Sequence, residues 1–317
     1  MKNILLNIFL VSFFALSCKQ LVKNQNQIVE NEIDSIQSVS ENKTQRPVTT
    51  NTGVLSKNDL IGFWVGYFRN AKDEDYDKGV YADETLSWTR ENKINISIDE
   101  ISGNAVKGHS IVAGNNRPFA GTCSEGNNAY SFIVSEPGDN KYDGKFSFSI
   151  QKNDSMLTGT WKSYKKIDIQ ERKYELVKKI FNYNPEQMLE RAREYGNWEK
   201  RKKVKIEDAE YDEFYDEFSA ATNKIYQMNA SKNLLTKKDV ENLKKGDLLI
   251  IRNTIYARHG YSFKNRPLRV FFDAQSWYIP VHTDIVSDLT DIEKKNIELL
   301  LKYEKNAKEY YDTFGRG

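Results

Sequence analysis

Apolar and polar residues alternate along the middle of the chain, from about residue 59 onward. Residues 93–101 are the clearest case, because isoleucine recurs at every second position, at Ile94, Ile96 and Ile98. A period of two is typical of a strand with one buried face. Further segments share this period, although less regularly: 62–68, 105–113, 118–123, 129–136, 144–151, 156–164 and 173–183.

Glycine, asparagine and aspartate gather between most of these segments, for example at 102–104 and 114–116. Short strands separated by tight turns predict an antiparallel meander. About eight strands can close into a small barrel, which buries the apolar face and leaves no free edge. We therefore predict an antiparallel β-barrel-like domain at residues 59–183, with a half-open sandwich as the alternative.

A helical pattern is expected after the strands. Asn184 followed by Pro185 can begin one helix, and aromatic residues on one stripe predict a second helix from about Glu207. The basic run at 200–205 could be a patch for a membrane or a polyanion. Its acidic neighbours favour mutual neutralisation on a solvated face instead. We predict a helical connector at residues 184–230.

Helix start and stop signals are clearest in the last part of the chain. The expected N-caps are Thr236, Asn265 and Thr290. A helix at 247–259 is expected to end before Gly260, which suits the position after a helix C-terminus. These signals predict a small all-α module at residues 231–317, so the whole chain is an α+β multidomain protein.

Residues 252–263 read Arg-Asn-Thr-Ile-Tyr-Ala-Arg-His-Gly-Tyr-Ser-Phe. This run resembles the signature of the YARHG domain, and Trp277-Tyr278 and residues 293–297 fit the same family. The resemblance implies a small helical module of exported bacterial proteins and implies no activity. More weakly, Gly62-Phe63-Trp64 and Gly159-Thr160-Trp161 resemble a short motif of lipocalin-like barrels.

On a helical wheel, His259 lies on the apolar stripe of Leu248, Ile251 and Ile255. There it could donate to the helix's last carbonyls or to another backbone oxygen, and Arg252 would need a carboxylate or several carbonyls. We therefore predict that the signature residues stabilise the fold rather than contact a ligand. These residues are Arg252, Asn253, Tyr256, Arg258, His259, Gly260 and Tyr261.

The N-terminus carries a targeting signal. Lys2 precedes an apolar run at 4–16, which is too short to span a bilayer as a helix. Ala15-Leu16-Ser17-Cys18 resembles a bacterial lipobox, which implies cleavage before Cys18 and lipid on its thiol; an ordinary secretory signal is the alternative. We expect a signal peptide at 1–17 and a disordered tether at 18–58. Lys19 after the cysteine favours the outer over the inner membrane.

Composition narrows the function classes. With 47 basic and 45 acidic residues, the charge is nearly balanced, which gives no indication of a nucleic-acid partner. If Cys18 carries lipid, only Cys123 remains, and no disulfide can form within the chain. No catalytic motif and no metal-binding spacing of the three histidines is found. We therefore predict no catalytic residue, no metal and no cofactor.

Aromatic side chains are the remaining binding candidates. Trp277 and Tyr278 could stack on a sugar or a peptide, and Trp64 could line a barrel cavity, although packing is the more common role of such residues. The sequence favours a lipid-anchored, non-catalytic binding protein of the bacterial cell envelope. Its expected partners are the membrane, through Cys18, and peptidoglycan, another glycan or an exported protein. The alternatives are a hydrolase acting at a barrel mouth and a carrier of a small apolar ligand.

Overall fold

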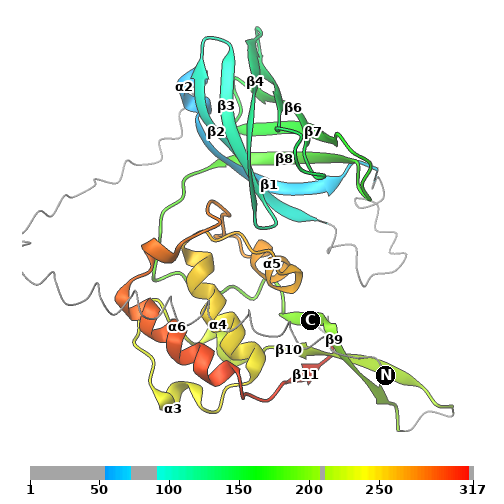
Figure 1. The fold of residues 1–317 in the computed structure, drawn as a ribbon, viewed down its shortest axis with the longest axis vertical. Coiled ribbons are helices and arrows are strands. Elements are labelled where there is room, and N and C mark those ends of the chain that lie inside the picture. Colours follow the sequence, from blue (N-terminus) through cyan, green and yellow to red (C-terminus); the bar gives the residue numbers. More distant parts are fainter. Residues whose placement is uncertain (1–53, 73–90, 208–210, 314–317) are drawn as a thin grey trace, which may run out of the picture. The chain divides into compact units, whose positions relative to one another are not determined.

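The structure is a computed structural model that describes residues 54–72, 91–207 and 211–313 (Figure 1). The predicted signal peptide, Cys18 and nearly all of the predicted tether lie outside these ranges. Within them, no helix is both long and apolar enough to cross a membrane.

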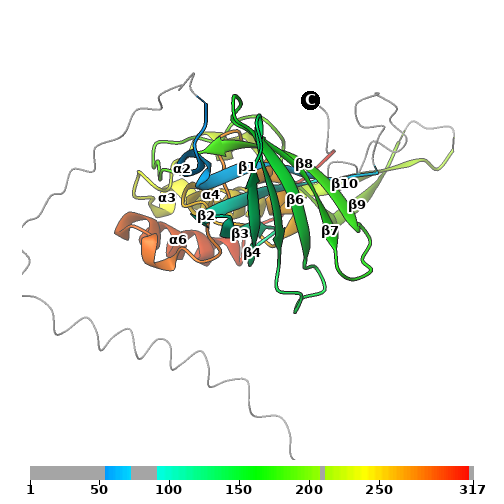
Figure 2. The same ribbon diagram turned by 90° about the horizontal axis from the view of Figure 1, so that it is seen from above.

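Eight antiparallel strands form a closed barrel, in which each strand pairs with the next and β1 also pairs with β8 (Figures 1 and 2). The strands are β1 Gly62–Asn70, β2 Asn92–Ser102, β3 Ala105–Val112, β4 Asn115–Glu125, β5 Ala129–Ser135, β6 Gly144–Gln151, β7 Met156–Ser163 and β8 Glu171–Lys179. Each predicted strand is confirmed within a few residues, and closure rules out the half-open sandwich.

Aromatic and aliphatic side chains pack against one another in the core of the barrel. Phe132 and Phe148 stack with ring centroids 4.6 Å apart, and Phe68 meets the edge of Trp161 at 5.6 Å. The short helix α2, Lys57–Leu60, adds the fully buried Leu60 to this core. The alternating apolar residues therefore stabilise the barrel by packing together in its interior.

The predicted helical connector is wrong. Residues 184–195 contain no helix, and a three-stranded sheet follows, in which β9 Gly196–Lys205 pairs with β10 Phe214–Ala220. The third strand, β11 Tyr311–Asp312, pairs with β10. Pairing with a neighbouring strand favours the sheet over a helix. The helical prediction is based on the apolar stripe of one segment, which contains no information about such a partner.

Opposite charges also face each other across β9 and β10. Arg201 lies 3.3 Å from Asp216, and Lys202 lies 4.0 Å from Glu217. Lys200, at the start of the basic run, pairs with Glu309 at 3.0 Å. The basic run therefore neutralises acidic neighbours on an exposed face, as the sequence indicated. Such exposed pairs each contribute about 0–1 kcal/mol.

The terminal helical module contains four α-helices: α3 Lys237–Val240, α4 Lys245–Arg258, α5 Arg266–Asp273 and α6 Asp291–Glu304. Two short 3-10 helices accompany them, η3 Asn223–Tyr226 and η4 Val286–Asp288. The predicted caps are confirmed: Asn265 accepts from the Leu268 N–H at 3.1 Å, and Thr290 forms a capping box with Glu293. Gly260 follows α4 with φ +70°, a conformation that favours glycine.

Helix α4 is the centre of the module. It contacts α5, α6, η3 and β10. Leu248, Ile251 and Ile255 are buried as the wheel predicted, but Ile250 and Ala257 on the opposite side are buried too. Helix α4 is therefore buried on more than one side, because neighbouring elements cover it from several directions.

Buried polar contacts join the barrel to the helical module. The Lys93 backbone N–H in β2 donates to Asp273 Oδ2 at 2.8 Å, and the Tyr67 hydroxyl donates to the Asp273 carbonyl at 2.8 Å. The Lys93 ammonium donates to the carbonyls of Gln275 and Tyr278 at 2.8 and 3.1 Å. Because unpaired buried polar groups are costly, these bonds fix one arrangement of the contact.

The buried carboxyl of Asp273 makes this contact sensitive to pH. Burial raises the pKa of Asp273 to about 6, although nearby cations, including Lys93, oppose the shift. Because the folded pKa exceeds the ordinary 3.8, the protonated form favours folding. The associated stabilisation is fully present below pH 3.8 and is lost as pH rises through about 6.

Asp273→Asn keeps an acceptor for the Lys93 N–H and removes the buried charge. We expect the variant to be more stable than the unchanged protein at about pH 7.5, by on the order of 1–3 kcal/mol, and to lose most of this advantage at about pH 4.5. Urea unfolding at the two pH values measures the difference. An equal advantage at both values would contradict the assignment to the Asp273 carboxyl.

Candidate functional site

His259 of the signature is the centre of a buried polar cluster. Its Nε2 lies 2.8 Å from Glu293 Oε2, and its ring stacks on Tyr183 with centroids 4.2 Å apart. The Tyr183 hydroxyl donates to the other Glu293 oxygen at 3.0 Å. His259 therefore faces the core, as predicted, but its partner is a carboxylate from α6 rather than a backbone carbonyl.

Glu293 is ionised in this cluster. Burial acts to raise its pKa, but the hydrogen bonds from His259 and from the Thr290 backbone outweigh burial and lower the pKa to about 2. The same carboxylate closes the Thr290 capping box. His259, the N-terminus of α6 and Tyr183 are therefore held together by one side chain.

The other signature residues, except Arg258, also lie at packing positions. Arg252 forms a two-point salt bridge with Glu304, at 3.0 and 3.3 Å, which supplies the carboxylate that the sequence required. Asn253 donates to the Leu249 carbonyl at 2.7 Å. Contacts between aromatic rings complete the motif: the ring centroids of Tyr256 and Tyr261 lie 6.0 Å apart, and those of Tyr261 and Phe263 lie 5.3 Å apart.

Arg258 differs from these residues because part of its guanidinium has no partner. The side chain is 3 % exposed. Nε donates to the Gln187 carbonyl at 2.8 Å, and Nη1 donates to Ser231 Oγ at 3.0 Å. Nη2 has no acceptor among the described residues. Burial lowers the pKa of Arg258 to about 10, so the group stays charged at neutral pH.

A cavity of about 220 Å³ adjoins Arg258. It lies between the segment that follows β8, the end of α4 and the loop after α5. Its lining residues are Ile180, Phe181, Asn182, Asn184, Gln187, Ala257, Arg258, Trp277 and Ile279. The indole Nε1 of Trp277 also has no acceptor among the described residues. The cavity is therefore lined by apolar side chains and by two residues, Arg258 and Trp277, that each carry one buried donor without an acceptor among the described residues.

Of the aromatic binding candidates, only Trp277 lines this cavity. Tyr278 is 1 % exposed and donates to the Tyr261 carbonyl at 2.7 Å. Trp64 is fully buried in the barrel core and donates to the Leu60 carbonyl at 2.8 Å. Tyr278 and Trp64 therefore pack within the protein and do not line this cavity.

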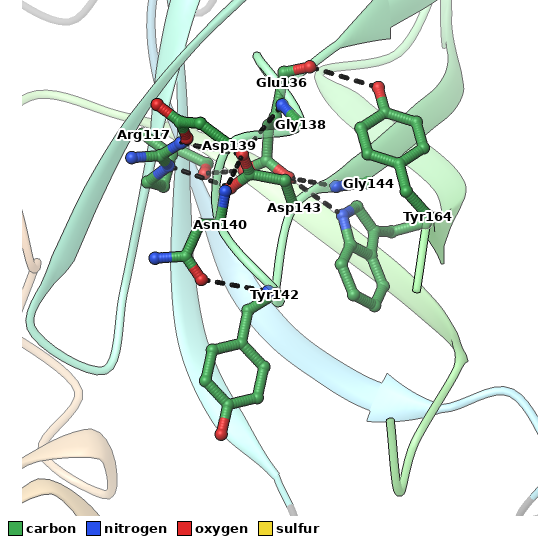
Figure 3. Close-up of polar contacts among 11 residues, drawn as sticks. Arg117, Glu136, Gly138, Asp139, Asn140, Tyr142, Asp143, Gly144 and Tyr164 are labelled. Atoms are coloured by element: carbon green, nitrogen blue, oxygen red, sulfur yellow. Dashed lines mark hydrogen bonds and ion pairs between the residues drawn. The ribbon is translucent and has the colours of Figure 1, made fainter. Parts of the chain in front are cut away.

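A second group of charged residues lies in the loop between β5 and β6 (Figure 3). Arg117 of β4 donates to both carboxylate oxygens of Asp143, at 2.9 and 2.7 Å, and also pairs with Asp139. The backbone N–H groups of Gly138 and Asn140 donate to Asp143 at 2.9 and 3.2 Å. Burial acts to raise the pKa of Asp143, but these donors outweigh it and hold the pKa below its ordinary value.

Glu136 lies beside this loop and is also internally paired (Figure 3). It accepts from Gly144 N–H at 2.7 Å, from Ser110 Oγ at 3.1 Å and from Trp161 Nε1 at 3.3 Å. Burial raises the pKa of Glu136. Asp143 and Glu136 accept hydrogen bonds from the loop and from the barrel wall. The two carboxylates therefore hold the β5–β6 loop against the barrel.

Ser262, His259 and Asp273 each bind a separate partner. Ser262 Oγ accepts from the Gly114 N–H at 2.9 Å, while His259 and Asp273 bind the separate partners described above. Cys123 is buried in the barrel core, and burial raises the pKa of its thiol. Among the described residues, no group of three His, Cys, Asp or Glu side chains is placed to hold a metal ion.

Residues 180–187 contribute more than half of the cavity lining, and the sequence analysis assigned them no binding role. They were assigned to the end of a strand and the start of a helix. A loop that packs against the end of a helix distant in sequence has no periodic pattern of its own. The local sequence therefore does not predict this part of the cavity.

Comparison with known proteins adds one family. Residues 223–305 match the YARHG domain, so the match starts before the predicted boundary at 231 and includes η3. Neither the curated proteins nor the solved structures gave a match to this chain. YARHG domains are typically extracellular or periplasmic. Residues 223–305 therefore form a YARHG domain, and its signature contributes Arg258 to the cavity.

Proposed function

We propose that this protein is a non-catalytic binding protein of the bacterial cell envelope, held on a membrane by lipid on Cys18. The observation that carries the proposal is the cavity beside the YARHG signature, which is lined by apolar side chains and by Arg258 and Trp277, each with one buried donor that has no acceptor among the described residues. A concave site with a few convergent polar groups is the usual form of a ligand site.

The location of the YARHG family supports the compartment, because these domains are typically extracellular or periplasmic. The predicted lipobox at residues 15–18 supports the anchor. We place the protein on the outer membrane, since Lys19 follows the cysteine. In that compartment, the partners available to the cavity are peptidoglycan, other glycans and exported proteins.

The two rival functions have less support. For a hydrolase at a barrel mouth, the acidic cluster of Glu136 and Asp143 is the nearest candidate, but both carboxylates are bound by their own loop and barrel wall. For a carrier of an apolar ligand, the candidate site is the barrel interior, where aromatic side chains contact one another, as Phe132 and Phe148 do at 4.6 Å.

Co-sedimentation with purified peptidoglycan sacculi tests the binding function. The protein would lack residues 1–17 and carry Cys18→Ser, so that lipid does not cause sedimentation. We expect the protein to pellet with sacculi and a Trp277→Ala variant to pellet less. If the unchanged protein stays in the supernatant at every sacculus concentration, peptidoglycan binding is wrong.

Replacement of the predicted lipid-bearing cysteine tests the anchor separately. Cys18→Ser in the full-length chain is expected to abolish acylation and to move the protein out of the membrane fraction, because two or three acyl chains anchor a protein stably and no other anchor is proposed. Fractionation followed by a salt wash measures this. Retention of the variant in the washed membranes would show that the anchor lies elsewhere.

A further inference from the structure

We propose that the cavity beside Arg258 binds a carboxylate carried by a single sugar or amino-acid group, of the kind that cell-wall glycan and its peptides supply. This inference rests on the proposed function, because it names the ligand class of the same site. It assigns Arg258 of the YARHG signature a binding role that the rest of the signature does not share.

The polar groups of the cavity point to an acceptor. Arg258 Nη2 and Trp277 Nε1 are both donors, and neither has an acceptor among the described residues. A buried donor without a partner is costly, and a charged one more so. An ionised carboxylate is the acceptor that fits a guanidinium best, because their bonds are charge-assisted and directional.

The charges around the cavity support the same choice. No aspartate or glutamate is found among the described residues that line it. Glu293 interacts electrostatically with Arg258, but its carboxylate already binds His259, Tyr183 and the Thr290 backbone. The positive charge of Arg258 is therefore available to a ligand, and a cationic ligand would meet no opposite charge in the lining.

The size and the walls limit the rest of the ligand. About 220 Å³ is below the roughly 300–1,000 Å³ of a typical small-molecule site, so the cavity takes one group of a larger molecule. Trp277, Phe181, Ile180 and Ile279 supply apolar surface, and Asn182 and Asn184 supply amides at the exposed edge. Apolar faces with amides at the edge suit a sugar ring or a small amino acid.

A matched pair of sugars tests the proposal directly. N-acetylmuramic acid differs from N-acetylglucosamine by a lactyl ether that ends in a carboxylate. Calorimetric titration of the full chain in detergent is expected to show at least about tenfold tighter binding of the acid. A second pair, acetyl-D-alanyl-D-alanine and its C-terminal amide, determines whether the carboxylate comes from sugar or peptide. Equal affinity within both pairs would overturn the proposal.

Variants locate the binding on the protein. Arg258→Lys keeps the charge but loses the guanidinium fork, and Trp277→Phe keeps a ring but loses the indole N–H. We expect both to weaken binding of the preferred acid, by about tenfold and about threefold. The control is Arg252→Lys, the other arginine of the signature, which pairs with Glu304 and is expected to leave binding unchanged. If Arg252→Lys loses ligand binding while Arg258→Lys and Trp277→Phe keep it, the proposed site is wrong.

Further results distinguish a failure of this inference from misfolding of a variant and from a failure of the proposed function. If circular dichroism shows that Arg258→Lys is unfolded, Trp277→Phe and the ligand pairs on the unchanged chain decide the proposal. If sacculi bind but neither carboxylate ligand does, the carboxylate inference is wrong and the proposed envelope binding stands. If a carboxylate binds and sacculi do not, the inference holds and peptidoglycan is excluded as the source.

Discussion

His259→Ala is expected to lower the free energy of unfolding by about 3–5 kcal/mol, because it leaves the carboxylate of Glu293 buried without its main partner. His259 is 5 % exposed and Glu293 is 0 % exposed, so water cannot replace the lost bond without a rearrangement. The variant also loses the stacking on Tyr183. Urea unfolding of the full chain, followed by helical circular dichroism, measures the effect.

The chain contains a matched control for this prediction. His109 also lies 2.7 Å from a carboxylate, that of Asp99, but the Asp99 side chain is 46 % exposed. Because exposed pairs contribute about 0–1 kcal/mol, His109→Ala is expected to change stability little. A similar loss in both histidine variants would mean that burial of the His259–Glu293 pair is not the cause.

The pH dependence of the buried pair has a defined sign. The folded pKa of Glu293 is about 2, below the ordinary 4.5. The stabilisation from its ionised form is therefore present above pH 4.5 and is lost as pH falls through about 2. His259→Ala is expected to reduce this acid sensitivity along with the stability.

Gly260→Val is expected to be at least as harmful, at about 3 kcal/mol or more, because it combines backbone strain with a clash. The residue has φ +70°, where a β-branched side chain is strongly disfavoured. A Cβ at this position would overlap the Val281 side chain and lie 2.9 Å from Phe181 Cε2. Thermal melts of the full chain measure the loss.

Gly103→Val separates the two causes. Gly103 has φ +59° in the turn between β2 and β3, and a Cβ there would meet no atom within 4 Å. This variant is therefore expected to show the backbone strain alone, about 1–2 kcal/mol. If Gly103→Val and Gly260→Val melt at the same temperature, the contacts of Gly260 with Val281 and Phe181 contribute nothing.

The barrel could be predicted almost completely from the sequence. Alternation of apolar and polar residues is clear in β6, where Phe146, Phe148 and Ile150 are buried and Lys145 and Ser147 are exposed. Alternation and turn residues are local signals, so one segment at a time suffices. The N-caps Thr236, Asn265 and Thr290 were predictable for the same reason.

The connector and the cavity depend on partners that are distant in sequence. β9 and β10 form a sheet through antiparallel backbone pairing, and Arg201 and Lys202 meet Asp216 and Glu217 across the strands. The cavity forms where residues 180–187 meet α4 and the Trp277 loop. The periodicity of a single segment gives no information about these contacts between distant segments. The role of Arg258 was missed for this reason, since the signature alone does not distinguish it from Arg252.

The signature of the YARHG domain is thus divided in this protein. His259, Arg252 and Gly260 lie at positions where pairing, packing or backbone geometry stabilises the module. Arg258 has one guanidinium nitrogen left without a partner beside a cavity. Under the proposed function, the same short motif therefore stabilises the module and supplies Arg258 to the cavity.

The most direct test of the binding site follows the indole N–H of Trp277 by NMR. The chain has five tryptophans, and Trp277→Phe identifies the signal of Trp277 among the indole resonances. On titration with solubilised peptidoglycan fragments, we expect the Trp277 resonance to shift in a saturable way, while that of the buried Trp64 stays in place. Fragments that bind and shift other resonances but leave Trp277 unchanged would contradict the account.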